Sequence, residues 1–186
     1  GLGDVYKRQD IKQYIGEAYF FRAYSYFDLL QLYGDVIITK KPLDITDPEM
    51  KVKRNDRSEV VDLIIDDLNH AVENLPAFKE LTTEEEGRIS KEGAQAFLSR
   101  VALYEGTWQK SRNGNQNTQR SANLLDIAAK AARTVIDAKY GYTFRLFGTD
   151  SETKILGDSA QKYMFILENE KSNPAGIKKS SNHEYI

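Results

Sequence analysis

The sequence predicts an all-α protein made of helical hairpins, with long loops inserted between them. Four segments between residues 10 and 138 repeat apolar residues at helical spacing. Three of these segments start or stop at a capping residue, a glycine or a proline. Small residues lie on the expected packing faces, as the close hairpins of repeat proteins require. We therefore expect an α-α superhelix of the tetratricopeptide (TPR) type, although the helix starts do not keep one spacing.

The first predicted helix runs from about residue 10 to residue 33. It stops at Gly34, a residue suited to the left-handed cap position. Residues 16–35 read GEAYFFRAYSYFDLLQLYGD and form the densest aromatic run of the chain. Residues 18–33 are apolar on nearly every side, which is typical of a helix surrounded by other helices. We expect this helix to be the most buried of the four.

A loop and a second helix follow. The loop extends from Val36 to Arg54, where Pro42 and Pro48 prevent longer regular structure. The second helix opens at Asp56, and Glu59 three residues later completes a capping box. Its apolar positions share one face, which we expect to be buried: Val60, Ile64, Leu68, Ala71 and Leu75.

The third and fourth helices are predicted from the same kind of pattern. The third begins after residues 87–89 with Ser90 as its N-cap, and a polar loop over 110–120 follows it. Its inward positions are Ala94, Phe97, Leu98, Val101 and Tyr104. The fourth helix is expected over 122–138. Its predicted buried residues are Leu125, Ala128, Ala132, Val135 and Ile136.

Three regions can be distinguished along the chain. Residues 1–9 read GLGDVYKRQ, which resembles translated adaptor sequence, so we exclude them from the fold and treat them as non-native. Residues 10–142 form the predicted helical scaffold. Residues 143–186 are expected to be an irregular or extended part of the same domain, cut short at its end.

The composition excludes several classes of partner and site. A net charge of −2 without a basic stripe argues against nucleic-acid binding. The absence of cysteine removes disulfides, thiol chemistry and cysteine metal sites. Arg22 and Asp28 interrupt the apolar run of the first helix, so no segment reads as a membrane span, and no signal peptide opens the chain.

Few residues of the sequence are candidates for ligand binding, metal binding or catalysis. Trp108, the single tryptophan, and Tyr26 are candidate platforms for stacking sugar rings, although large aromatic residues at such positions commonly belong to the core. His70 and His183 lack the spacing of a metal site or a nucleophilic triad. No candidate pair of catalytic carboxylates is recognisable. We therefore predict no catalytic residue, no metal site and no cofactor.

Arg22 is the unusual residue of the first helix because it is charged among apolar neighbours. A buried guanidinium needs a carboxylate or carbonyl partner, and no carboxylate lies three or four residues away. We expect Arg22 to be buried and paired with the second helix, with Asp62 and Asp66 as the nearest candidates. Replacing Arg22 by methionine is then expected to cost less than removing its partner.

Several blocks in fixed order resemble the SusD/RagB family, the outer-membrane nutrient-binding lipoproteins of Bacteroidetes. The aromatic first helix ends in the turn Tyr33-Gly34-Asp35-Val36, as in that family. The other matching blocks are RSEVVDLIIDDL at 57–68, GRISK at 87–91, ALYEGTW at 102–108 and AARTVID at 131–137. Together they cover residues 10–142. The chain is identified as an internal fragment of a SusD-like protein.

The resemblance implies a function without enzymatic chemistry. It implies glycan binding at the cell surface, for nutrient uptake, beside a SusC-like TonB-dependent outer-membrane transporter. The membrane connection would be a lipid anchor that lies outside this chain. In that family the ligand contacts lie mainly on loops before and after the matched segment, so no binding residue is carried over.

Two other classes of function stay open at this stage. An intracellular TPR-type adaptor would hold a peptide in a concave helical groove, and an upstream lipidated cysteine would exclude it. A helical glycosidase would need an acid pair at catalytic separation and would release reducing sugar.

Overall fold

The computed structural model describes residues 2–85, 87–112, 118–149, 151 and 153–163. Four long helices make up most of it: α1 (Leu2–Tyr33), α2 (Arg57–Asn74), α3 (Lys91–Arg112) and α4 (Thr118–Ile136). The short helical turns are η1 (Pro48–Lys51), η2 (Phe78–Glu80), η3 (Thr83–Glu85), η5 (Lys154–Ser159) and α5 (Ala160–Tyr163). Within the described residues, the β-type pairing consists of one isolated antiparallel bridge between Val36 and Asn55. The predicted all-α class is confirmed.

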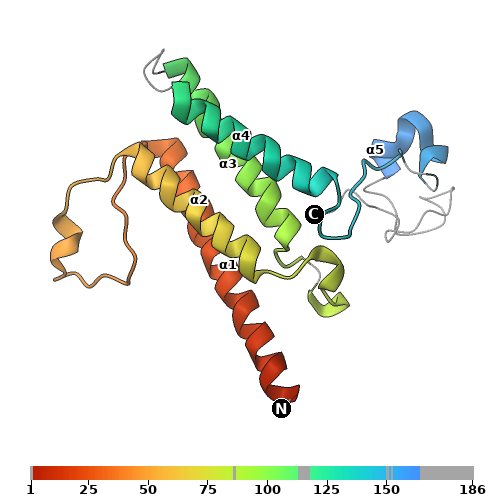
Figure 1. Ribbon diagram of the computed structural model, residues 1–186, viewed down its shortest axis with the longest axis horizontal. Helices are drawn as coiled ribbons and strands as arrows, with labels where there is room; N and C mark the ends of the chain where they lie inside the picture. Colours follow the sequence, from red (N-terminus) through yellow and green to blue (C-terminus); the bar gives the residue numbers. More distant parts are fainter. Residues whose placement is uncertain (1, 86, 113–117, 150, 152, 164–186) are drawn as a thin grey trace.

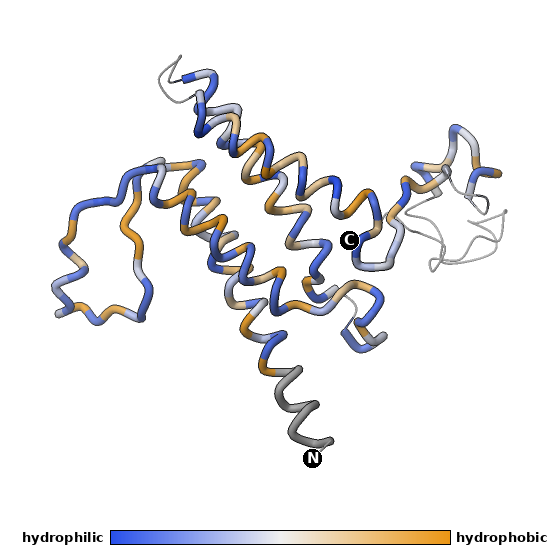
Figure 2. The backbone as a smooth tube through the Cα atoms, in the orientation of Figure 1, coloured by the Kyte–Doolittle hydropathy of each residue, from blue (hydrophilic) through white to orange (hydrophobic). Residues whose placement is uncertain are grey.

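The four long helices form two antiparallel hairpins. Helix α1 packs on α2, α3 packs on α4, and the two hairpins meet where α2 packs on α3 (Figure 1). A core of aliphatic and aromatic side chains from all four helices fills the space between them. The α1–α2 loop extends away from this bundle, and η5 and α5 lie at its opposite side. Figure 2 shows apolar residues alternating with polar ones along each helix, as one-sided packing requires.

Local sequence explains where the helices begin and end. Gly34 has φ +71° and its N–H donates to Leu30 O at 3.0 Å, which closes α1 with a left-handed cap. Asp56 and Glu59 form the predicted capping box at the start of α2. At the start of α3, Ser90 Oγ accepts from Gly93 N–H at 3.2 Å, so this N-cap is also confirmed.

The helix boundaries differ from the prediction in three places. Helix α1 begins at Leu2 and not at residue 10. The helix start does not test whether residues 1–9 derive from adaptor sequence, so that origin stays a prediction. Helix α3 continues to Arg112, and α4 begins at Thr118 and ends at Ile136, so the predicted 110–120 loop is shorter. The segment from residue 143 onward, predicted to be irregular or extended, contains the short helical turns η5 and α5 among its described residues, and residues 164–186 lie outside the described part of the chain.

The buried face of α4 agrees only in part with the prediction. Ala128 is buried as predicted and Leu125 packs on Gly106, but the face is rotated toward Ser121, Leu124 and Ala131, and Ile136 is 69% exposed. The contact with α3 sets this rotation, because Ser121 Oγ donates to Gly106 O at 2.8 Å and Leu125 lies directly over Gly106. Small residues occur on both candidate faces, so the spacing alone could not choose between them.

Helix α1 is not the most buried helix, contrary to the prediction. It buries Phe20, Ala23, Phe27 and Leu30 against its neighbours. Its opposite side stays exposed along most of its length, because α2 and α3 cover one side only. A helix that is apolar all round needs packing neighbours on every side to be fully buried, and the described residues provide neighbours on one side only.

Candidate functional site

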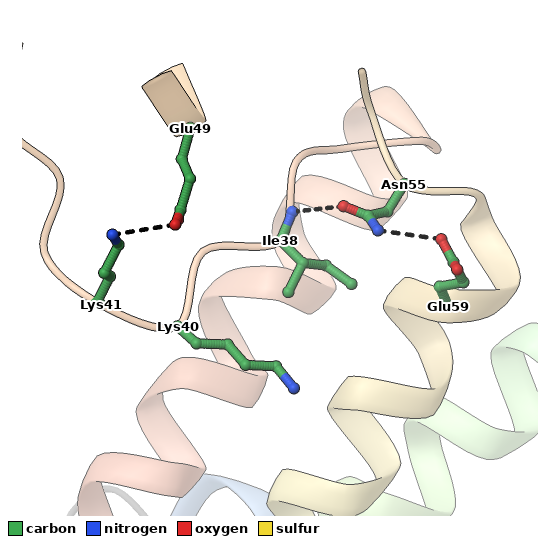
Figure 3. A pocket seen from close by; sticks show the side chains of 6 residues that line it. All are labelled: Ile38, Lys40, Lys41, Glu49, Asn55 and Glu59. Carbon is green, nitrogen blue, oxygen red and sulfur yellow. Dashed lines mark hydrogen bonds and ion pairs between the residues drawn. The ribbon is translucent and has the colours of Figure 1, made fainter. Parts of the chain in front are cut away.

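The α1–α2 loop forms a polar pocket beside the start of α2. Its volume is about 530 Å³. The lining residues, shown in Figure 3, are Ile38, Lys40, Lys41, Glu49, Asn55 and Glu59. They come from both arms of the loop and from the first turn of α2. Segments 20 residues apart in sequence therefore meet at this site.

Hydrogen bonds hold both ends of the loop on the helices. The Tyr26 hydroxyl accepts from Thr39 N–H at 2.7 Å. Asn55 N–H donates to Val36 O at 2.9 Å, and the Asn55 side-chain oxygen accepts from Ile38 N–H at 2.9 Å. The N–H groups of Thr39 and Ile38 in the loop are thus hydrogen-bonded to the side chains of Tyr26 on α1 and Asn55 just before α2. The base of the pocket has a defined shape for this reason.

The pocket contains a mixture of hydrogen-bond donors and acceptors. The Lys41 ammonium lies 3.0 Å from Glu49 and 3.3 Å from Asp47, and the hydrogen bond to Glu49 is the main cause that raises its pKa. Glu59 accepts from Asn55 Nδ2 at 3.1 Å (Figure 3). Lys40 has no ion-pair partner among the residues that the structure describes. Such groups can bind a ligand rich in hydroxyl groups.

A second polar pocket of about 580 Å³ lies between α2 and α4. Arg120 on α4 binds Asp62 at 2.8 Å, and Gln119 donates to Asn123 at 2.8 Å. Four of the polar side chains that line this groove therefore bind one another in pairs, and the groove lies between the two hairpins.

The two aromatic candidates are both engaged in contacts within the chain. Tyr26 is 7% exposed, and its hydroxyl holds the α1–α2 loop. Trp108 is half-buried, with the guanidinium carbons of Arg57 and Arg112 at 4.2 and 4.4 Å from its ring centroid. Sugar binding at either residue stays a prediction, and it would have to compete with these contacts.

Arg57 lies at the centre of a cluster that the sequence analysis missed. Its guanidinium pairs with the fully buried carboxylate of Glu105, with Nε at 2.9 Å and Nη2 at 2.8 Å from Oε2. Nη1 donates to Leu30 O at 3.3 Å, and Gln109 donates to Glu105 at 2.6 Å. Arg57 therefore connects the end of α1 and the start of α2 to α3. The detectable signal was Glu105 itself, a charge four residues after Val101 on the inward face of α3.

Arg22 has the predicted kind of partner but a different residue. It forms a bidentate pair with Asp67, with distances of 2.7 Å from Nε and 2.6 Å from Nη2. Asp62 and Asp66, the predicted partners, are exposed because they lie on the outer side of α2. Burial is also unequal: the Asp67 side chain is 1% exposed and that of Arg22 is 34% exposed. The hydrogen bond to Asp67 is the main cause that raises the pKa of Arg22.

Two further searches concern metal ions and membranes. In the described part of the chain, no group of three or more His, Asp and Glu side chains is placed to hold a metal ion. None of the described helices combines the length and the apolar character that crossing a bilayer requires.

Comparison with known proteins gives one consistent result. Residues 3–103 match the SusD-like family described as "Starch-binding associating with outer membrane". SusD-like protein P38 of Formosa agariphila is 37% identical over 93 residues, which are 50% of this chain and 17% of that protein. A SusD-like protein of Bacteroides fragilis of known structure superposes with a TM-score of 0.63 at 26% identity, over 94% of this chain and 26% of that one.

A further solved structure is named as a laminarin-binding SusD-like protein. It superposes with a TM-score of 0.56 at 26% identity, over 82% of this chain and 30% of its own. The chain thus spans less than a third of the length of each of these relatives. The family match covers more than half of the chain. It includes the aromatic helix, the α1–α2 loop and Arg57, and it ends before Glu105. This chain belongs to the SusD-like family.

Proposed function

We propose that the full-length protein containing this chain binds an oligosaccharide or polysaccharide at the cell surface, as the SusD-like partner of a SusC-like TonB-dependent transporter. The observation that carries this proposal is the family match over residues 3–103, to a family described as starch-binding and associated with the outer membrane. The laminarin-binding relative supports a glycan as the ligand. We also infer that the protein binds its ligand without catalysis and that a lipid anchor outside this chain holds it at the outer membrane.

The packing of the helices supports a scaffold role for residues 10–142. Phe20, Tyr26 and Phe27 lie in the core and Trp108 pairs with arginines, which favours ligand contacts on loops. Most such loops are expected outside this chain, as the family resemblance implies. The pocket of the α1–α2 loop offers polar groups of the type that sugars bind, and it is the place in this chain where a glycan contact would fit.

Affinity electrophoresis tests the proposal. The full-length protein and residues 1–186 would be run in native gels containing laminarin, starch or other plant and algal glycans. We expect at least one glycan to retard the full-length protein and none to retard residues 1–186 measurably. Failure of a broad panel to retard the full-length protein would reject glycan binding. Retardation of residues 1–186 that is lost in Trp108→Ala or Tyr26→Ala would instead place the site on those residues.

The same preparations separate the alternative functions. Release of reducing sugar from a retained glycan would indicate a glycosidase, and the inference of binding without catalysis would then fail. Co-purification of the full-length protein with the TonB-dependent transporter encoded beside it would support the proposed partnership. An adaptor of the TPR type would bind neither the glycan nor the transporter.

A further inference from the structure

The outer face of α1 is an uncovered apolar surface. We use this name for the residues Ile11, Tyr14, Ile15, Ala18, Phe21, Leu29 and Leu32. The six large side chains among them are all exposed, and Leu32 reaches 73%. They extend over 22 residues of helix, which corresponds to about 33 Å. Soluble proteins rarely leave a continuous apolar stripe of this length in contact with water.

The spacing of this face is that of a helix–helix seam. Most of its members are three residues apart, Ser25 lies four residues from both Phe21 and Leu29, and Ile11, Ala18 and Leu32 fall with Ser25 on one line of seven-residue repeats. The opposite side of α1 already packs on α2 and α3 through Phe20, Ala23, Phe27 and Leu30. Helix α1 therefore has two packing faces, one of which is occupied.

Two polar residues, Arg22 and Ser25, lie within the seam, and both have partners. Arg22 falls on a seven-residue line with Ile15 and Leu29, and its guanidinium binds Asp67 of α2. Ser25 Oγ donates to Phe21 O at 2.9 Å, so its hydroxyl already has a partner within the helix. Ser25 and Ala18 are the small residues of the seam, and they leave room for large side chains of a second helix. Asp28 borders the seam and is exposed, so a basic residue on the covering helix would complement it.

The covering element is best supplied by the same polypeptide. This chain corresponds to 17% of SusD-like protein P38 and to 26% of the Bacteroides fragilis structure, so the relatives contain a large additional part. TPR-type helices pack on neighbours on both sides along a superhelix, and a helix with a second apolar face lies inside such a stack. We propose that the outer face of α1 is covered, in the full-length protein, by an amphipathic helix from outside residues 1–186.

Thiol accessibility in the full-length protein tests this proposal directly. The 186 residues contain no cysteine, so Leu32→Cys and the matched control Ile45→Cys each introduce a single thiol into this region. Ile45 lies on the α1–α2 loop and is 90% exposed. The rate of maleimide labelling at each site would be measured by peptide mapping, in native buffer and in denaturant. We expect labelling at position 32 to be at least about tenfold slower than at position 45 in native buffer, and equal in denaturant.

Three other outcomes of the labelling and crosslinking experiments would contradict the proposal. Equal native labelling rates at the two positions would overturn the proposal. Protection of position 32 that disappears on dilution, together with a change from dimer to monomer mass, would assign the face to a second copy and would also overturn it. A photo-crosslinker attached at position 32 should join a peptide outside residues 1–186, and a product confined to residues 1–186 would contradict the proposal. Far-ultraviolet circular dichroism verifies that both cysteine variants are folded.

Discussion

Two buried carboxylates, Asp67 and Glu105, are each held by an arginine from another helix. Arg22 of α1 binds Asp67 of α2, and Arg57 of α2 binds Glu105 of α3. In both pairs the carboxylate is almost fully buried and the arginine is more exposed. Removal of the arginine leaves a charge in a poorly solvated site, whereas removal of the carboxylate leaves an arginine that can reach water. Loss of the arginine should therefore destabilise each pair more than loss of the carboxylate.

This asymmetry reverses the order of effects expected from the sequence for Arg22. We predict that Arg22→Met lowers the free energy of unfolding by about 3 kcal/mol, because it leaves Asp67 unpaired. Asp67→Asn keeps the shape of the side chain and removes the buried charge, so about 1–2 kcal/mol is expected. Urea denaturation followed by circular dichroism measures both values. A larger loss in Asp67→Asn than in Arg22→Met would show that Arg22 is the less solvated partner.

The Arg57 cluster offers an optical readout because Trp108 is the only tryptophan. Arg57→Lys keeps the charge but cannot form the bidentate pair and stacks less well on the ring, so we predict a loss of about 2 kcal/mol of stability. The Trp108 emission maximum should shift as the ring changes its surroundings. Arg54→Lys, on the exposed loop nearby, serves as the control. Unchanged stability and emission in Arg57→Lys would mean that the cluster contributes only through charge.

At the scale of elements, the α1–α2 hairpin depends on one close approach. A Cβ atom on Gly16 would lie 2.8 Å from Leu75 Cγ and 3.0 Å from the Leu75 backbone nitrogen, at the end of α2. Substitution of glycine by alanine within a helix normally stabilises it by about 1 kcal/mol. Here the clash with backbone opposes that gain, since Leu75 N–H is itself bonded to Ala71 O.

We therefore predict that Gly16→Ala destabilises the protein by about 1–3 kcal/mol, the range found for overpacked cores. Ala129→Gly, on the exposed side of α4, measures the intrinsic helix preference alone and should cost about 1 kcal/mol. Thermal unfolding of both variants provides the comparison. A stabilised Gly16→Ala variant would show that α2 can move away from α1 at little cost.

The α1–α2 loop is an element whose order depends on Tyr26. Tyr26→Phe removes the acceptor of Thr39 N–H and leaves this partly buried donor unpaired, at a cost of about 1–2 kcal/mol. We predict faster tryptic cleavage at Lys40, Lys51 and Lys53 in this variant, because the loop opens more often. Tyr33→Phe, at the exposed end of α1, should leave the cleavage rate unchanged. Equal rates in both variants would argue that the Val36–Asn55 pairing alone holds the loop.

At the scale of the whole molecule, stability is expected to come from the core that joins the two hairpins. Phe27 of α1 meets Phe97 and Tyr104 of α3 edge to face, with ring centroids 5.5 and 5.4 Å apart. We predict that Phe27→Ala costs about 3–5 kcal/mol and Leu98→Ala about 2–5 kcal/mol. Ile45→Ala, on the exposed loop, should change the free energy of unfolding by less than about 0.5 kcal/mol. Equal effects at the three sites would contradict the observed core.

Both hairpins should then unfold in a single transition. The contact between α2 and α3 crosses from one hairpin to the other, and the main core cluster contains residues of all four helices. Circular dichroism and Trp108 fluorescence should therefore give coincident unfolding curves. Two separate transitions would mean that the hairpins are independent units.

The sequence by itself determined the helices, their caps and the family. These features depend on neighbours along the chain: Gly34 ends α1, Asp56 and Glu59 start α2, and Ser90 starts α3. Apolar spacing also identified the buried face of α2, because a single face of that helix carries large aliphatic residues. Most of the ordered blocks that resemble SusD-like proteins lie on the same helices. The family match over residues 3–103 confirms the resemblance for the blocks within that range.

The spacing could have selected Asp67 as the partner of Arg22, because Asp67 lies three residues after Ile64 and four before Ala71, on the face of α2 that was predicted to be buried. The tertiary structure alone decided the Arg57–Glu105 pair and the rotation of α4, because both depend on how the helices are turned against one another. The exposure of α1 has the same origin. An apolar sequence predicts that the surface of α1 is buried, whereas only the fold shows that α2 and α3 cover one side of α1.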